Sequence, residues 1–174
     1  MPISLLGLVL GLLIPQQPIV ERPIKLGAPV AVAEGITLTI AFGSARSREA
    51  FASAGMKGLV LDLQFDAKSY ATFRLEPSSD SAKSGVALET SGQRVGGPVA
   101  LTNYLADKPD GPKITRIAEL TPMPKTGRGY FSWVAFTGRG VVSVLFEAPF
   151  QPGATVLLLD FELGDNFHRL RVSL

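Results

Sequence analysis

Several segments of this chain alternate apolar and polar residues with a period of two, and no other feature constrains the fold as strongly. In residues 36–42 (ITLTIAF), the isoleucines, the leucine and the phenylalanine fall on one face and the threonines on the other. Residues 59–65, 157–163 and 170–174 repeat the pattern. Such alternation is typical of antiparallel strands with one buried face and one wet face. We therefore expect the acidic residues within these segments to point to solvent.

Further strands are predicted between these segments, and turn residues such as proline, glycine and aspartate separate them. Residues 130–136 and 141–146 are apolar on both faces, which is typical of central strands. Because one-faced sheets bury their apolar sides against each other, about eight to ten strands predict an antiparallel all-β sandwich. A closed β-barrel is the alternative. The single helical candidate is 47–54, with Ser47 as its N-cap. The weaker strand predictions are 70–75, 86–90, 99–105 and 114–120.

The N-terminal part of the chain differs in composition from the rest. Residues 1–15 hold an apolar run of twelve residues that ends at a proline. A membrane-spanning helix needs ~20 residues, whereas a signal-peptide core needs about 7–15. The segment therefore predicts export, and a buried N-terminal helix or strand is the alternative. Residues 16–29 are proline-rich and predict an extended linker or an edge strand. Residues 30–174 are then one sandwich domain.

The letters TGRG occur twice, at residues 126–129 and 137–140. A phosphate-binding loop needs a glycine-rich turn that leads into a helix, and here each copy leads into strand-forming residues. The net charge is only +2, which gives no basic surplus for nucleic acid. We interpret both copies as turns at strand ends, with glycines at positive φ.

Few residues in the chain suit catalysis. There is no cysteine, and His168 is the only histidine. His168 shares the parity of Leu170 and Val172, so we expect a partly buried structural histidine. A hydrolase would need a serine and a carboxylate close to it, and no Gly-x-Ser-x-Gly motif occurs. We expect no catalytic residues and no enzyme; a hydrolase that uses His168 is the third-ranked function.

One candidate metal site is present near the C-terminus. Asp160, Glu162, Asp165 and Asn166 lie close in sequence and offer the oxygen ligands that calcium takes. No EF-hand pattern is present, and residues 164–166 are also a common hairpin turn. We therefore expect no cofactor, with calcium as the one possibility at these four residues.

Asp62 and Asp66 share one strand face, as the two carboxylates of a glycosidase must. A solvated strand face has the same pattern, and we favour that interpretation. Among the aromatic residues, the candidates for an exposed sugar-stacking row are Tyr70, Tyr104, Tyr130 and Trp133. Tyr130 and Trp133 have opposite parity on their strand, which argues against such a row there.

Four segments resemble a family of small extracytoplasmic bacterial immunoglobulin-like domains. Residues 137–149 (TGRGVVSVLFEAP) are similar to a late strand of that family, and residues 156–163 are similar to the strand after it. Residues 35–40 and 58–65 resemble its first two strands. The resemblance implies an immunoglobulin-like sandwich without assigned catalytic residues. Family members are often lipoproteins, and this chain lacks the cysteine that a lipid anchor needs.

Together these features predict a non-catalytic, extracytoplasmic module that is secreted or held at the cell envelope. The expected partner is another envelope or extracellular protein. Nucleic acid is not expected, and membrane contact is expected only through an uncleaved N-terminal segment. The alternative is a carbohydrate- or small-ligand-binding module, which exposed coplanar aromatic residues would favour.

Overall fold

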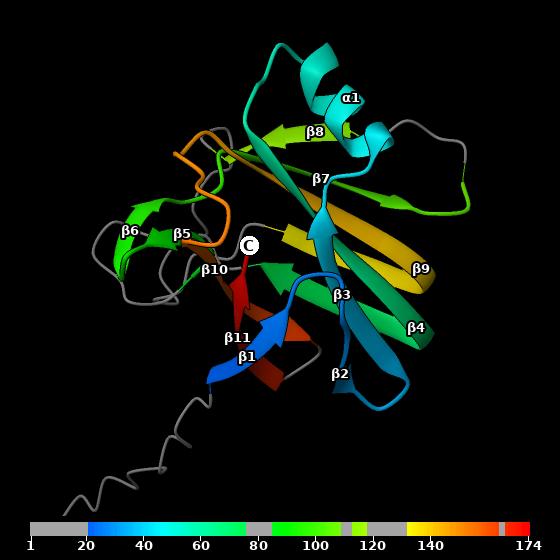
Figure 1. Ribbon diagram of the computed structural model, residues 1–174. Helices are drawn as coiled ribbons and strands as arrows, with labels where there is room; N and C mark the ends of the chain where they lie inside the picture. Colours follow the sequence, from blue (N-terminus) through cyan, green and yellow to red (C-terminus); the bar gives the residue numbers. More distant parts are fainter. Residues whose placement is uncertain (1–20, 76–84, 109–112, 118–131, 164–165) are drawn as a thin grey trace, which may run out of the picture.

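The computed structural model describes residues 21–75, 85–108, 113–117, 132–163 and 166–174, and these contain eleven strands and one helix (Figure 1). The segment 1–15, predicted as a signal peptide, lies outside the described residues. The elements are β1 (Glu21–Lys25), β2 (Pro29–Ala33), β3 (Ile36–Phe42), α1 (Ala45–Ser53), β4 (Leu59–Leu75), β5 (Ala87–Thr90), β6 (Gln93–Gly96), β7 (Ala100–Leu105), β8 (Lys113–Arg116), β9 (Ser132–Phe146), β10 (Thr155–Leu163) and β11 (Asn166–Ser173).

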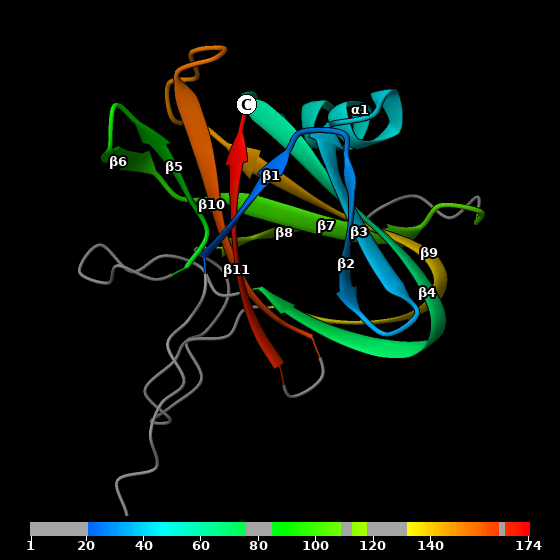
Figure 2. The ribbon, with the colours of Figure 1, turned by 60° about the horizontal axis from the view of Figure 1, so that its bottom comes forward.

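Two long strands, β4 and β9, take part in both layers of the fold. They pair antiparallel along almost their whole length, with a register shift between Ala67 and Ala71. Gly138, opposite Ala67, has a φ of 85°. A bulge of this kind increases the bend and twist of a strand pair, and Figure 2 shows β4 and β9 curving round together. One hydrogen-bonded network of strands therefore folds over into two layers.

We call the two layers the helix layer and the terminal layer. The helix layer has the strand order β2–β3–β4–β9–β7–β8 and uses β4 and β9 on one side of the bulge. The terminal layer has β1, β11 and β10 beside the other ends of β4 and β9, with β5 paired to β10 and β6 paired to β5. β1 and β11 form a parallel pair.

The inward side chains of both layers meet in one hydrophobic core. Leu63 and Val144 from the helix layer and Phe73, Phe161 and Leu170 from the terminal layer belong to the same buried cluster. The predicted all-β sandwich is therefore confirmed. The strand count is one above the expected range, and the path of strands runs from β1 to β8 without closing, so the barrel alternative is wrong for the described strands.

The bulge explains the main difference from the predicted strands. Segments 59–65 and 70–75 were expected as two strands and form one, β4. Segments 130–136 and 141–146 were also expected as two, and residues 132–146 form the single strand β9. The second TGRG copy thus lies inside a strand rather than at a turn, although its Gly138 has the expected positive φ. The first copy, residues 126–129, lies outside the described residues.

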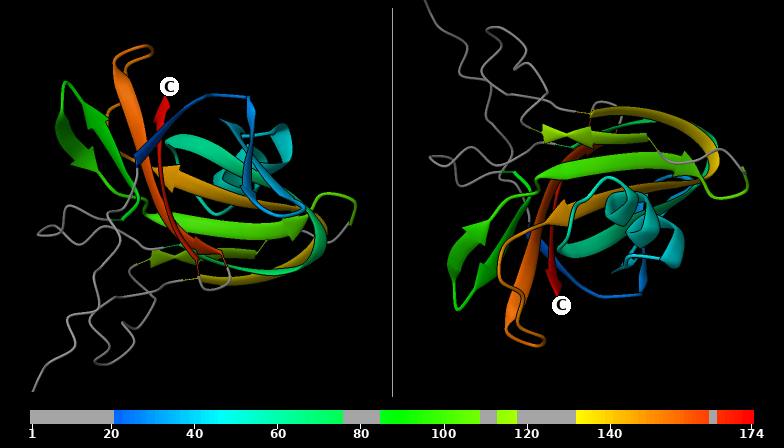
Figure 3. Two further views of the ribbon diagram at one scale, coloured as in Figure 1. Left: turned by 90° about the horizontal axis from the view of Figure 1, so that it is seen from below. Right: turned by 90° about the horizontal axis from the view of Figure 1, so that it is seen from above.

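Helix α1 begins two residues earlier than predicted. Its N-cap is Ser44, whose hydroxyl accepts a hydrogen bond from the Ser47 backbone N–H at 3.2 Å. Ser47, predicted as the cap, is instead a fully buried residue inside the helix. Phe51 and Met56 pack on the outward side chains of the helix layer, and Figure 3 shows α1 over this layer. The helix therefore covers part of a strand face that alternation alone predicts to be wet.

Within the segment expected as a linker, residues 21–25 form the edge strand β1 beside β11. This agrees with the edge-strand interpretation for that part of the segment. Among the described residues, no helix is long and apolar enough to cross a membrane.

Candidate functional site

The outward face of the helix layer changes from apolar to polar along its strands. Residues paired in register project to the same side of a sheet, so outward side chains form rows across β3, β4, β9 and β7. From the helix-covered end to the open end, the rows are Val60–Leu145–Ala100, then Ala41–Asp62–Ser143–Thr102, then Thr39–Gln64–Val141–Tyr104, and then Thr37–Asp66–Arg139.

The second of these rows holds a buried carboxylate at the N-terminus of α1. Asp62 is 1% exposed. Its Oδ1 accepts a hydrogen bond from the Ser143 hydroxyl at 2.7 Å, and its Oδ2 accepts one from the Ser44 backbone N–H at 2.9 Å. A negative charge is favourable beside the N-terminus of a helix, where backbone N–H groups lack helical partners. Asp62 therefore ties the start of α1 to the sheet.

A chain of hydroxyl groups extends this attachment. The Ser47 hydroxyl lies 2.9 Å from the Ser143 hydroxyl and 2.8 Å from the Tyr104 hydroxyl. Because each buried hydroxyl has a partner, the network avoids the cost of unsatisfied polar groups. We call Ser44, Ser47, Asp62, Tyr104 and Ser143 the docking network. It holds α1 and β7 in fixed positions beside the open end of the face.

The prediction that Asp62 faces solvent is wrong, whereas its neighbour Asp66 on the same face is exposed. The physical reason is α1, which folds back over one end of the face and leaves the other end open. Asp62 also accepts hydrogen bonds from two members of the docking network, Ser44 and Ser143, whereas Asp66 lies outside that network. The structure thus gives them different surroundings, although they share one strand.

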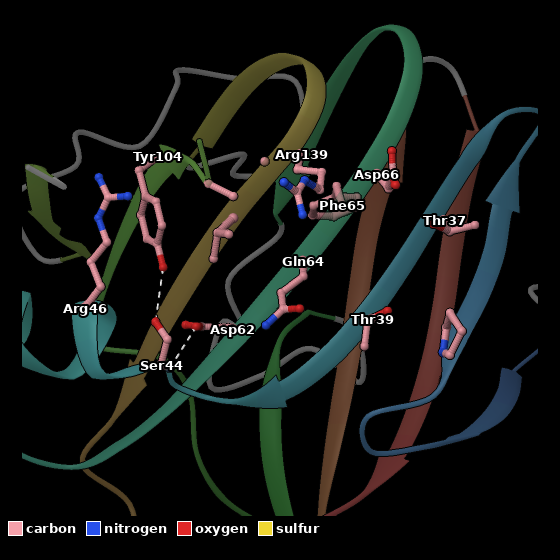
Figure 4. Close-up of a pocket in the computed structure, with 14 residues that line it drawn as sticks. Thr37, Thr39, Ser44, Arg46, Asp62, Gln64, Phe65, Asp66, Tyr104 and Arg139 are labelled. Atoms are coloured by element: carbon pink, nitrogen blue, oxygen red, sulfur yellow. Dashed lines mark hydrogen bonds between the residues drawn. The ribbon is translucent and has the colours of Figure 1, made fainter. Parts of the chain in front are cut away.

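The open end of the face forms a groove with a volume of about 580 Å³. Its polar lining includes Thr37, Thr39 and Gln64, and Asp66 and Arg139 lie opposite each other in register. Figure 4 shows Arg46 and Tyr104 at one side of the groove and Thr37 at the other. The groove is therefore built by β3, β4, β7 and β9, with the first turn of α1 as part of its wall.

Charges of both signs line the groove. The guanidinium carbon of Arg46 lies 4.3 Å from the centre of the Tyr104 ring, within the range of a cation–π contact. Arg139 donates a hydrogen bond to the Asp107 carboxylate at 2.7 Å, and both side chains are 64% exposed. An exposed pair of this kind is strongly screened by water. Because Asp62 and Asp66 balance the two arginines, the groove has no strong excess of either charge.

His168 lies in the terminal layer, on β11. Its ring stacks on Phe161, with ring centres 4.9 Å apart, and its Nδ1 is 3.4 Å from Nη2 of Arg22. Its Nε2 is buried without a hydrogen-bond partner among the described residues. Burial, and next the positive charge of Arg22, lower the pKa of His168 below the usual 6.5. The predicted partly buried histidine is confirmed.

The calcium candidate is not assembled by the described residues. Asp160 is 1% exposed, and its oxygens accept hydrogen bonds from Arg169 and from the Gly85 backbone N–H, at 2.7–2.8 Å. Asn166 pairs with Leu163 and so projects from the face opposite to Asp160 and Glu162. Asp165 lies outside the described residues. No group of three or more His, Cys, Asp or Glu residues is placed to hold a metal in the part described.

The prediction that Asp160 faces solvent is also wrong. A paired arginine, Arg169, lies directly across on β11 and covers it.

Of the tyrosines, Tyr70 is 69% exposed at the bend of β4, and Tyr104 lines the groove. Tyr130 lies outside the described residues.

The groove itself was missed in the sequence. Its signal was present as the polar side of the 36–42 and 59–65 alternation, which carries threonine, glutamine and aspartate. Comparison with known proteins adds nothing to this picture, because no family model, curated protein or solved structure matches the chain. The resemblance to the immunoglobulin-like family therefore stays a prediction.

Proposed function

We propose that this chain is a non-catalytic, extracytoplasmic binding module and that the groove of the helix layer is its binding site. The observation that carries the proposal is the groove: a hollow of about 580 Å³ that is lined by polar side chains of paired strands. Ligand sites commonly have volumes of about 300–1,000 Å³ and a few well-placed polar groups. The docking network favours a preformed site, because it fixes one wall of the groove.

The size of the groove favours a small ligand, or one protruding group of an envelope component, over a broad protein interface. This shifts the emphasis from the expected protein partner to the small-ligand alternative. The non-catalytic part of the proposal is supported by the place of His168, which lies in the other layer, on β11. Asp62 is the buried carboxylate of the groove, and its oxygens already accept bonds from Ser44 and Ser143.

The test is a ligand-observed NMR screen of a small-molecule library against the full chain, with a variant that fills the groove. Gln64 is exposed, so Gln64→Trp places a large side chain in the groove without entering the core. Gln93→Trp on β6 is the matched control, because it adds the same side chain at an exposed strand position. We expect Gln64→Trp to abolish binding that Gln93→Trp retains. Equal binding by both variants would contradict the proposed site.

The proposed location has a separate test. If residues 1–15 direct export, expression in a bacterium should give an N-terminally shortened product in the extracytoplasmic fraction. Full-length protein confined to the cytosol would contradict that part of the proposal.

A further inference from the structure

The polar side chains of the groove offer both hydrogen-bond donors and acceptors. The Gln64 amide and the hydroxyls of Thr37 and Thr39 can each do both, while Asp66 accepts and Arg139 donates. A ligand that matches this lining must itself carry several groups that donate and accept. Hydroxyl groups have this property, whereas phosphate and carboxylate groups at neutral pH mainly accept.

The charges of the groove argue in the same direction. An anion near Arg139 would also meet the exposed Asp66, which faces Arg139 in register. A cation near Asp66 would meet Arg139 for the same reason. Because like charges at short range are unfavourable, the lining discriminates against both and favours a neutral ligand.

The groove also presents apolar surface between its polar groups. Val141 lies between Gln64 and Tyr104 in the same row across the sheet, and Pro29 belongs to the lining on the β2 side. One ring face of Tyr104 is covered by Arg46, so this tyrosine is not a free stacking platform. The ligand would then be held mainly by hydrogen bonds, with C–H groups over the exposed Pro29 and the small exposed part of Val141, which is 8% exposed.

From these three features we propose that the groove binds a neutral saccharide. A sugar ring combines several hydroxyl groups with apolar C–H faces and carries no charge, which fits the lining described above. Planar groups such as the Gln64 amide, the Asp66 carboxylate and the Arg139 guanidinium can each contact two neighbouring hydroxyls. This inference rests on the proposed function, because it assigns a ligand class to the same groove.

Isothermal titration calorimetry of the full chain tests the inference. The panel is glucose, galactose, mannose, N-acetylglucosamine and their short oligomers, with inorganic phosphate, sulfate and a short neutral peptide as the other arms. The variants are Gln64→Ala and Asp66→Ala, with Thr39→Val as a nearly isosteric change that replaces a hydroxyl by a methyl group. Gln93→Ala is the matched control. Near-ultraviolet circular dichroism checks that each variant keeps its fold.

We expect at least one neutral saccharide to bind and the anions to leave the groove empty. Each groove variant should weaken the binding about tenfold, since each removes one good hydrogen bond from the site, and Gln93→Ala should leave it unchanged. Failure of every saccharide to bind would overturn the inference. Binding of phosphate, sulfate or peptide that the groove variants weaken would also overturn it but leave the proposed function standing. If neither this panel nor the library screen yields a ligand of the groove, the proposed function is contradicted as well.

Discussion

Replacing Asp62 with alanine should lower the free energy of unfolding far more than replacing Asp66, although the two residues share a strand and a face. Asp62 is 1% exposed and accepts hydrogen bonds from Ser143 and from the Ser44 backbone. Hydrogen bonds to a charged group contribute about 1.5–3 kcal/mol each. Losing both, and leaving the Ser44 N–H without its acceptor at the helix N-terminus, should cost roughly 3–5 kcal/mol.

Asp66→Ala is the matched control, because Asp66 is exposed. A surface substitution of this kind should change the free energy of unfolding by no more than about 0.5 kcal/mol. Urea unfolding of the full chain, followed by far-ultraviolet circular dichroism, measures both variants with the slope of the transition as a check on two-state behaviour. Equal and small effects for the two variants would refute the buried docking network. A large effect for both would refute the contrast between the covered and the open end of the face.

Three further predictions concern other parts of the fold. Because the pKa of His168 is lowered below 6.5, the unfolded chain binds a proton more readily than the folded chain, so stability should fall as the pH drops below 6.5 towards the folded pKa. Urea midpoints measured across this pH range should therefore change less with pH in His168→Gln than in the original chain, and an equal change would contradict the lowered pKa. Gly138 has a φ of 85° and open space around it, so Gly138→Ala should cost about 1 kcal/mol through backbone strain alone, and a neutral effect on thermal unfolding would argue against the bend. Arg169→Met removes the ion-pair partner of the buried Asp160 carboxylate and should lower the free energy of unfolding in urea by about 3–5 kcal/mol. A decrease of less than about 1 kcal/mol would show that Asp160 is not held by this pair.

Alternation in the sequence predicted several strands correctly. Predictions from the sequence were wrong where the structure depends on packing between segments far apart in the chain. Segment 36–42 was predicted with its observed bounds, because Ile36, Leu38 and Ile40 enter the core. Phe42 was expected on the same buried face but is 46% exposed. The bend of β4 and β9 could not be predicted, because a bulge depends on the pairing of two strands far apart in sequence. Gly138 was wrongly predicted to lie in a turn for the same reason, since a glycine with positive φ suits a turn and a bulge equally.

The candidate site was hidden for a related reason. Alternation places Asp62 and Asp66 on one polar face, and only the position of α1 divides that face into a covered and an open part. Asp160 was misjudged in the same way, because the arginine that covers it comes from another strand. The half-buried position of His168 was predictable, since it follows from strand parity together with its place near the start of β11.

The most direct test of the groove as a binding site is amide chemical-shift mapping of the isotope-labelled full chain with the tightest-binding saccharide of the panel. We expect saturable shifts at groove positions of the helix layer, such as Thr39, Gln64 and Arg139, and none at Gln93 or His168. Shifts confined to the terminal layer, or spread evenly over the chain without saturation, would contradict it.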